Sequence, residues 1–128
     1  MRKIALVLLF ASWLFSIDWI TSYDKALEVA RGEKKPILVV FLRDDCKYCA
    51  KLANETLSNS AIIETISKDF VPLYIDVNNN PQDTRKANLS FQGVPASFVI
   101  DSSGKQKSKL FGFQPPMSYM GFLQHNTN

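Results

Sequence analysis

Cysteine and histidine are scarce in this chain, which has two cysteines and one histidine among 128 residues. Two cysteines are too few for a framework of structural disulfides, and a Cys/His zinc cage needs four soft ligands. The hydrophobic content of 46% and the charged content of 21% are typical of a soluble globular domain. With no internal repeat and no long polar tract, the sequence excludes a disordered chain, a collagen-like repeat and a multi-span membrane protein. Its length fits one domain.

The charge is nearly balanced, because 15 Lys and Arg stand against 12 Asp and Glu, a net charge of +3. The basic residues are scattered along the chain, so we infer no nucleic-acid-binding surface. If the N-terminal segment that contains Arg2 and Lys3 is removed on export, 13 basic residues remain against 12 acidic ones, a net charge of +1. We therefore expect that long-range electrostatic attraction does not select the partners of the mature domain.

An apolar stretch opens the chain. Arg2 and Lys3 precede residues 4–17, which carry almost no polar atoms, and an acidic residue follows. This run is shorter than the roughly 20 residues that a membrane-spanning helix needs. A charged start, a short apolar run and a polar exit are typical of a secretory signal peptide. The sequence therefore predicts an export segment at residues 1–20 and a folded domain at residues 21–128, located in the periplasm or secreted.

The way in which this segment is processed stays open. No clear Ala-x-Ala cleavage signal is present, and cleavage after Ala11, Ser12 or Ser16 is compatible with the sequence. One alternative is an uncleaved membrane anchor over residues 4–20. The other is a buried N-terminal helix.

Apolar periodicity divides the rest of the chain into helices and strands. The six apolar residues 37–42 are typical of a strand buried on both faces. The predicted order is α-β-α-β-α-β-β-α, in which we expect strands separated by helices to pair in parallel and the last strand to be antiparallel. Strands are predicted at 37–42, 70–77, 96–100 and 105–111, and helices from Thr21 to Gly32, from Cys46 past Leu57, around Ile62–Ile66, from Pro81 to Leu89 and from Pro115 onward.

Polar residues mark the start of three of these helices. Thr21 is the expected N-cap of the first helix, and Asp44 or Asp45 of the helix that begins near the first cysteine. Asn80 is the expected N-cap of a later helix, with Pro81 at its first position.

The two cysteines, Cys46 and Cys49, lie where the buried strand gives way to a helix. The first turn of a helix has unpaired N–H groups and a partial positive charge, which favour a thiolate over a thiol. Lys47 adds a positive charge, whereas Asp44 and Asp45 oppose it. Because the thiolate is the attacking form, we expect Cys46 to be the nucleophile. Cys49 lies one turn further along and would resolve a mixed disulfide.

Two structural interpretations of the cysteines compete with the catalytic one. A disulfide that closes a ring of about 4 residues constrains the unfolded chain by about 2 kcal/mol, against about 3 kcal/mol for a 15-residue ring, so stability is a weak reason for this spacing. Two inert core cysteines are the second alternative, although exported proteins rarely keep free thiols. Covalent haem is excluded, because Ala50 stands where that motif needs histidine.

At this point the chain resembles the thioredoxin superfamily, over about residues 22–124. The resemblance lies in Lys35-Pro36 before the first strand, Cys46-Lys47-Tyr48-Cys49 at the helix start, and Gly93-Val94-Pro95 before the third strand. It implies an α/β, three-layer fold with a central mixed sheet flanked by helices, here preceded by the export segment.

Two further segments narrow this resemblance. Residues 70–77 and 111–113 are similar to those of small exported thioredoxin-like proteins. They are also similar to those of the C-terminal periplasmic domain of the transmembrane disulfide-interchange reductase. The resemblance therefore favours reduction of disulfides or relay of electrons.

The resemblance also implies a substrate-binding site. It implies that Pro95 follows a cis peptide bond and lies beside the cysteines, and that the backbone of Val94 pairs with an extended substrate peptide as an added strand. From the residues alone, the alternative is that Gly93-Val94-Pro95 forms a simple turn before a strand.

The chain departs from the family pattern at two positions. Asp45 stands where the family usually has tryptophan, so a negative charge adjoins the nucleophile. Val40 stands where reductants of the family often carry a buried acid that moves the proton of the second thiol. Glu33 and Asp76 are possible substitutes. We therefore expect Asp45, Lys47 and Tyr48 to modulate the cysteine pair, although their effect on its potential does not follow from the sequence.

The sequence thus predicts an exported thiol–disulfide oxidoreductase with Cys46 and Cys49 as catalytic residues and Val94 and Pro95 as substrate-binding residues. It needs no organic cofactor and no metal, because the two sulfurs hold the electrons. Expected partners are disulfide-containing client proteins and a membrane electron donor, and we expect a monomer. The alternatives are a thiol oxidase or disulfide isomerase on the same fold, and a non-catalytic module that binds an extended peptide.

Overall fold

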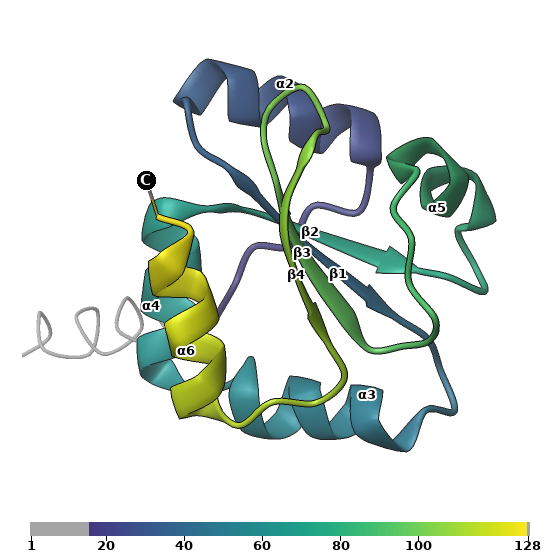
Figure 1. The fold of residues 1–128 in the computed structure, drawn as a ribbon, viewed down its shortest axis with the longest axis vertical. Coiled ribbons are helices and arrows are strands. Elements are labelled where there is room, and N and C mark those ends of the chain that lie inside the picture. Colours follow the sequence, from purple (N-terminus) through teal and green to yellow (C-terminus); the bar gives the residue numbers. More distant parts are fainter. Residues whose placement is uncertain (1–15, 128) are drawn as a thin grey trace, which may run out of the picture.

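The computed structural model describes residues 16–127 and has three layers, a central four-stranded sheet with helices on both faces (Figure 1). The strand order is β2-β1-β3-β4. Helices α2 and α5 cover one face, and α3, α4 and α6 cover the other. The elements are α2 (Tyr23–Glu33), β1 (Ile37–Leu42), α3 (Lys47–Lys51), the π-helical turn η2 (Leu52–Thr56), α4 (Ser60–Asp69), β2 (Val71–Asp76), α5 (Pro81–Ala87), β3 (Ala96–Ile100), β4 (Gln106–Phe111) and α6 (Pro116–His125).

Strand β1 is the centre of the fold, and its burial on both faces is confirmed. All six of its residues are buried. Because side chains alternate along a strand, Ile37, Val39 and Phe41 enter one core, and the residues between them enter the other. This arrangement explains why the sequence of β1 is a continuous apolar run rather than an alternating one.

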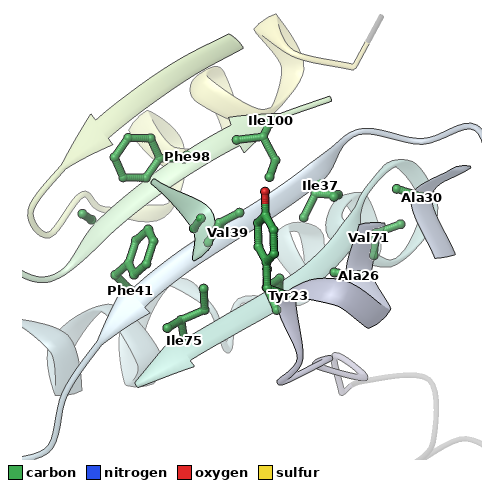
Figure 2. Close-up of a cluster of buried hydrophobic side chains, with 13 residues drawn as sticks. Tyr23, Ala26, Ala30, Ile37, Val39, Phe41, Val71, Ile75, Phe98 and Ile100 are labelled. Carbon is green, nitrogen blue, oxygen red and sulfur yellow. The ribbon is translucent and has the colours of Figure 1, made fainter. Parts of the chain in front are cut away.

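The first core lies between the sheet and helices α2 and α5 (Figure 2). Helix α2 contributes Tyr23 and two small residues that let it approach the strands closely. Near the C-terminal end of β1, the ring of Phe41 stacks on that of Phe91 with centroids 4.4 Å apart and meets the ring of Phe98 edge-on at 5.7 Å. Such aromatic pairs add about 1 kcal/mol each beyond the area they bury. Cys46 follows this end of β1, so the aromatic contacts stabilise the strand end that leads to the cysteines.

The second core lies between the sheet and helices α3, α4 and α6. The predicted apolar face of α4 is confirmed, because Ile62, Ile63 and Ile66 are all buried. Tyr119 of α6 is fully buried, and its hydroxyl lies 2.7 Å from the Ser97 hydroxyl of β3. The hydrogen bond satisfies both buried hydroxyl groups and joins α6 to the sheet.

The direction of β3 differs from the sequence prediction. β1 and β2 are parallel, as expected, but β3 is antiparallel to β1, with Phe41 opposite Ala96. A parallel β3 would require the chain to return along the whole sheet after β2. Helix α5 has seven residues, about 10 Å of helix, and it lies with residues 88–95 at the edge where β2 ends. Strand β3 therefore starts at the edge where β1 ends (Figure 1).

The ends of α2 also differ from prediction. Ser22 rather than Thr21 is the N-cap, because its hydroxyl accepts the N–H of Lys25 at 3.2 Å. Gly32 lies inside the helix, which ends at Glu33 and is followed by Lys34 in the left-handed conformation. The short side chains at 21 and 22 are chemically alike, so only the turn of the backbone decides which of them caps.

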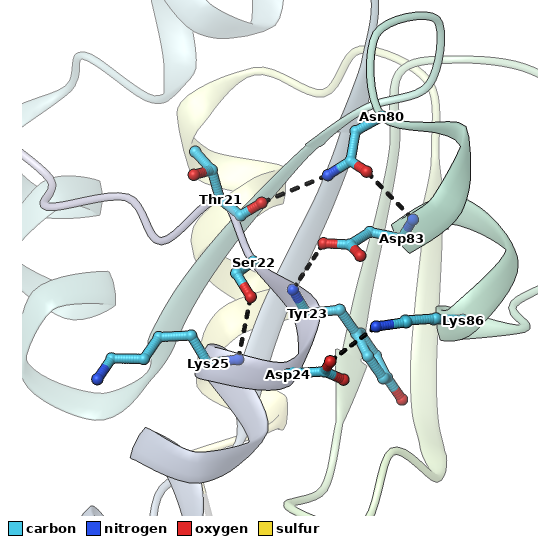
Figure 3. Close-up of polar contacts among 8 residues, drawn as sticks. All are labelled: Thr21, Ser22, Tyr23, Asp24, Lys25, Asn80, Asp83 and Lys86. Atoms are coloured by element: carbon cyan, nitrogen blue, oxygen red, sulfur yellow. Dashed lines mark hydrogen bonds and ion pairs between the residues drawn. The ribbon is translucent and has the colours of Figure 1, made fainter.

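A hydrogen bond and an ion pair join helix α5 to the start of α2 (Figure 3). The N–H of Tyr23 donates to the Asp83 carboxylate at 2.8 Å, and Lys86 pairs with Asp24 at 2.7 Å. The predicted start of α5 is confirmed, with Asn80 as N-cap. The helix ends at Ala87, close to the expected end at about residue 89, and a left-handed residue follows.

Residues 17–20 pack against the domain, although they fall within the segment predicted as the export signal. Ile17 and Trp19 contact the second core, and Ile20 contacts the first. Ile20 pairs with the outer edge of β2: its N–H donates to the Pro72 carbonyl, and the Tyr74 N–H donates to the Ile20 carbonyl, both at 2.9 Å. Ile20 thus covers part of an otherwise open strand edge.

The remainder of the predicted export segment, residues 1–15, lies outside the described residues. Within residues 16–127, the helices do not combine the length and the apolar sequence that crossing a bilayer requires.

From the edge pairing of Ile20 we predict that residues 17–20 stabilise the folded domain. A chain that begins at Thr21 should have a free energy of unfolding about 2 kcal/mol lower than one that begins at Ile17, because it lacks two backbone hydrogen bonds and the contacts of residues 17–20. Urea denaturation of the two chains measures the difference. Equal midpoints would show that residues 17–20 do not stabilise the domain.

Candidate active site

The two cysteines lie at the sheet edge where β1 ends, and they form a disulfide. Their Cα atoms are 5.2 Å apart. Cys46 is half-buried, whereas Cys49 is only 4% exposed. The pair therefore has one sulfur that a partner can reach and one that is covered by the second core.

Cys46 itself caps the helix that follows, so the predicted caps Asp44 and Asp45 are wrong. The backbone of Cys46 is extended, and its sulfur accepts the N–H of Cys49 at 3.2 Å. Asp45 has a φ of 59°, in the left-handed region, and its side chain is exposed. This turn precedes the extended backbone of Cys46, whose sulfur rather than the Asp45 carboxylate accepts the helix N–H. Aspartate tolerates this conformation better than most residues do.

The geometry at Cys46 favours negative charge on its sulfur in the reduced state. The Cys49 N–H points at the sulfur, and the first-turn N–H groups of the helix add their partial positive charge. The ammonium group of Lys47 lies 5.8 Å from the ring centre of Tyr48. Tyr48, between the two cysteines in the sequence, is 54% exposed.

The helix of the cysteines continues as a π-helical turn, which the sequence analysis missed. After α3, the Leu57 N–H donates to the Leu52 carbonyl at 2.9 Å, five residues back. The extra residue in this turn buries Thr56 beside Leu57 and leaves Ala53 exposed. π-Helical turns occur frequently at functional sites. An apolar pattern with a period of 3.6 cannot reveal a turn that departs from that period.

The Val94–Pro95 segment lies beside the cysteines, and its peptide bond is cis. The Val94 carbonyl oxygen is 3.8 Å from the Cys46 sulfur. Because a disulfide sulfur carries no proton, we read this distance as a van der Waals contact in the oxidised pair. Pro95 is buried and Val94 is half-buried. The structure thus brings together four of the residues that the sequence singled out.

Aromatic side chains surround this junction. Phe111, at the end of β4, is 57% exposed and lies against Gly93, where an added Cβ would be 3.8 Å from its ring. Phe113 is half-buried, and the Lys51 ammonium lies 4.6 Å from its ring centre. Phe111 is thus largely exposed, whereas Phe113 packs against the second core.

Neither substitute for the missing buried acid occupies its position. Val40 is fully buried in the second core, directly opposite Tyr74 of β2. Glu33 precedes β1, so the length of that strand separates it from Cys46, and it pairs with Lys35 at 3.4 Å.

Asp76 lies at the correct edge of the sheet but caps a turn. Its carboxylate accepts the N–H groups of Asn78 and Asn79, both at 3.0 Å, and the Asn79 side-chain amide at 2.8 Å. These bonds, that of the Asn79 N–H first, hold the pKa of Asp76 below its usual value. A carboxylate so stabilised is a weak base.

Tyr74 is a polar group near the cysteines that the sequence analysis did not single out. It packs against the second core, and burial, followed by the charges of Asp76 and Asp44, raises the pKa of its hydroxyl. It therefore stays protonated at neutral pH. Within residues 16–127, no three His, Cys, Asp or Glu side chains gather in a way that could hold a metal ion.

The comparison with protein families agrees with this fold and site. The model of the thioredoxin-like domain matches residues 23–126. The chain therefore belongs to the thioredoxin-like family. This match includes both cysteines and the Val94–Pro95 segment.

Curated relatives extend the comparison. Anterior gradient protein 3 of Mus musculus is 28% identical over 108 residues, which are 80% of this chain and 66% of that protein. Disulfide bond reductase DsbH of Chlamydia pneumoniae is 29% identical over 110 residues, which are 78% of this chain and 65% of that protein. The chain thus spans just under two thirds of the length of these relatives.

Solved structures agree with the fold. A thioredoxin from Thermus thermophilus superposes with a TM-score of 0.72 at 21% identity, covering 86% of each chain. The reduced C-terminal domain of DsbD from Neisseria meningitidis superposes with a TM-score of 0.66 at 25% identity, covering 80% of this chain and 92% of that domain. The predicted three-layer fold with a mixed sheet is confirmed, as is the resemblance to the disulfide-interchange reductase domain.

The turn capped by Asp76 gives a pH-dependent prediction. Asp76→Asn should lower the free energy of unfolding by about 1 kcal/mol at pH 7, because a neutral amide accepts hydrogen bonds more weakly than a carboxylate. The folded-state pKa of Asp76 is lowered, so its contribution is present above the unfolded value of about 3.9 and is lost as the pH falls through the lower folded value.

Urea denaturation between pH 7 and pH 3 tests this prediction. The difference between the native chain and Asp76→Asn should shrink below about pH 4. Asp18→Asn, at an exposed aspartate, is the matched control and should track the native chain throughout. A difference that stays constant down to pH 3 would contradict the assigned role of the carboxylate.

Proposed function

We propose that this protein is a thiol–disulfide oxidoreductase that reduces protein disulfides or relays electrons to them. The observation that carries the proposal is the disulfide between a reachable Cys46 and a buried Cys49, beside the backbone of Val94. The matched family and the reductase among the curated relatives support the same activity.

The difference in burial between Cys46 and Cys49 supports an order in which the two cysteines react. In the reduced protein, the Cys46 thiolate attacks one sulfur of a client disulfide. The client S–S bond breaks, and the departing client sulfur takes a proton from solvent. Cys49 then loses its proton and attacks the Cys46 sulfur, which breaks the mixed disulfide and releases the second client sulfur. Two electrons pass to the client, and the product is the Cys46–Cys49 disulfide of the structure.

The client is proposed to bind as an extended segment across the two elements of the site. The N–H and C=O of Val94 would pair with the client backbone as an added strand, next to the cis Pro95. The exposed rings of Tyr48 and Phe111 would contact client side chains on either side of the disulfide. Asp45 and Lys47 are exposed beside Cys46 and would modulate its charge.

The direction of electron flow depends on the reduction potential. A value near about −270 mV would favour a reductant and one near about −120 mV an oxidant. We propose the reductant, with a membrane electron donor that returns the Cys46–Cys49 disulfide to dithiol after each cycle. Oxidation or isomerisation of client disulfides is the alternative, and equilibration with glutathione buffers distinguishes them.

We further propose that the domain at residues 21–128 works as a monomer outside the cytoplasm. The support for the location is the charged and apolar pattern of residues 1–20, which is typical of an export segment. The proposed reaction needs no organic cofactor or metal, because the two sulfurs carry both electrons.

The proposed activity makes a direct prediction for insulin reduction with dithiothreitol as the electron source. The native chain should accelerate the precipitation of the insulin B chain. Cys46→Ser should lower this catalysed rate at least about 100-fold, because no thiolate is left to attack. Equal rates for the native chain and Cys46→Ser would leave only a peptide-binding module with idle cysteines.

Cys49→Ser should instead hold the client. Its Cys46 can still attack, but no second thiol resolves the mixed disulfide. We expect a covalent complex on non-reducing gels that disappears with dithiothreitol, and mass spectrometry of that complex would identify the client. Cys46→Ser/Cys49→Ser is the control. Absence of any disulfide-linked partner in cells that express Cys49→Ser would contradict the mechanism.

A further inference from the structure

We propose that Thr56 is a positioning residue that ties the loop after β4 to the cysteine helix and thereby holds the client-binding backbone of Val94 and Pro95 in place. This inference rests on the proposed function. The Thr56 hydroxyl bonds to the loop rather than to a cysteine, so Thr56 would act through the loop.

Thr56 is a fully buried polar residue whose hydroxyl bonds to a distant part of the chain. It has no exposed surface, and its Oγ1 donates to the Gln114 carbonyl oxygen at 2.6 Å, across 58 positions of sequence. A threonine in a helix commonly bonds its hydroxyl to a carbonyl of the preceding turn. Here the hydroxyl instead satisfies a carbonyl of the segment between β4 and α6.

The same segment holds the cis-proline backbone by a second hydrogen bond. The Gly112 N–H donates to the Pro95 carbonyl oxygen at 2.8 Å. Gly112 has a φ of 78°, a conformation that glycine adopts without strain, so the chain can turn here toward Gln114. The loop therefore contacts Pro95 at one end and Thr56 at the other.

These contacts close a ring around the site. The cysteine helix leads from Cys46 to Thr56, and Thr56 bonds the loop at Gln114. The loop bonds Pro95, and the neighbouring Val94 carbonyl lies 3.8 Å from the Cys46 sulfur. The distance between the client-binding backbone and the nucleophile is thus set from both sides, by direct contact and through the Thr56 bond.

The π-helical turn explains why Thr56 can make this bond. Thr56 is the last residue of the π-helical turn, so the five-residue hydrogen-bond spacing sets the direction in which its side chain leaves the helix. The Leu57-to-Leu52 hydrogen bond widens the turn, and Thr56 and Leu57 are both buried. The turn therefore keeps the apolar contact of Leu57 while it turns the Thr56 hydroxyl toward the loop.

A positioning role separates client binding from the chemistry of the sulfurs. The hydrogen bond from the Cys49 N–H to the Cys46 sulfur does not involve Thr56. Loss of the Thr56 hydroxyl should therefore leave the reduction potential unchanged. It should weaken the pairing of Val94 with an extended client, because loosening of the loop adds an entropy cost to binding. The rate at which the protein reduces a small disulfide, which needs no strand pairing, should not change when the Thr56 hydroxyl is lost.

The test compares Thr56→Val with Thr56→Ser and a matched control in the full chain. Thr56→Val keeps the shape and removes the hydroxyl, whereas Thr56→Ser retains it. Thr65→Val makes the same change at a threonine of α4 whose hydroxyl donates to the Met120 sulfur at 3.5 Å, away from the loop. The readouts are KM and kcat for insulin, the rate with dithionitrobenzoate, the reduction potential and the exchange of the Gly112 amide proton.

We expect Thr56→Val to raise KM for insulin about 10-fold, with an unchanged potential, an unchanged rate with dithionitrobenzoate and faster exchange at Gly112. Thr56→Ser and Thr65→Val should resemble the native chain. Thermal melting shows whether each variant is folded. If Thr56→Val does not fold, Thr56→Ala takes its place with the same expectation.

Three outcomes overturn the inference. An unchanged KM in a folded variant that lacks the hydroxyl shows that the loop is held without it. A fall in the rate with dithionitrobenzoate equal to that with insulin, or a matching change in Thr65→Val, assigns the effect to general destabilisation. A native chain that reduces neither insulin nor dithionitrobenzoate refutes the proposed function itself, and with it this inference.

Discussion

The pairing of β1 with β3 is the constraint on which the site depends. Phe41 lies opposite Ala96, so the end of one central strand and the start of the other meet at the same edge of the sheet. Cys46 follows the first strand and Pro95 precedes the second, which brings the nucleophile and the client-binding backbone within contact distance. Both strands are buried on both faces, and displacing either would expose the two cores at once.

The cysteine pair combines accessibility with control of charge. A helix end that is capped by the reactive sulfur itself leaves the first-turn N–H groups free to stabilise a thiolate. The left-handed backbone at Asp45 stores strain of order 1 kcal/mol, and the surrounding packing must offset it. Such strain beside a reactive group is typical of functional sites, and it accompanies the exposure of the Asp45 carboxylate where the family usually has tryptophan.

Local signals in the sequence were sufficient for most elements and failed where two similar residues compete. The apolar run of β1, the isoleucines of α4 and the Asn80-Pro81 start of α5 each had one consistent interpretation, and the structure confirms them. Capping was assigned wrongly near Thr21, because Thr21 and Ser22 have the same hydrogen-bonding capacity. It was also assigned wrongly near Cys46, where the sulfur rather than the carboxylate of the preceding left-handed Asp45 caps the helix. The π-helical turn was missed because it departs from the 3.6-residue period, and the buried role of Thr56 was missed because its partner lies 58 positions away.

The sequence by itself determined the family, the two cysteines, their place between a buried strand and a helix, and the Val94-Pro95 motif, because these depend on residues close together in the chain. Only the tertiary structure decided the antiparallel direction of β3 and the partners of Thr56 and Gly112. The physical reason is that strand direction and burial are set by the packing of distant segments, where cores must be filled and buried polar groups must find partners.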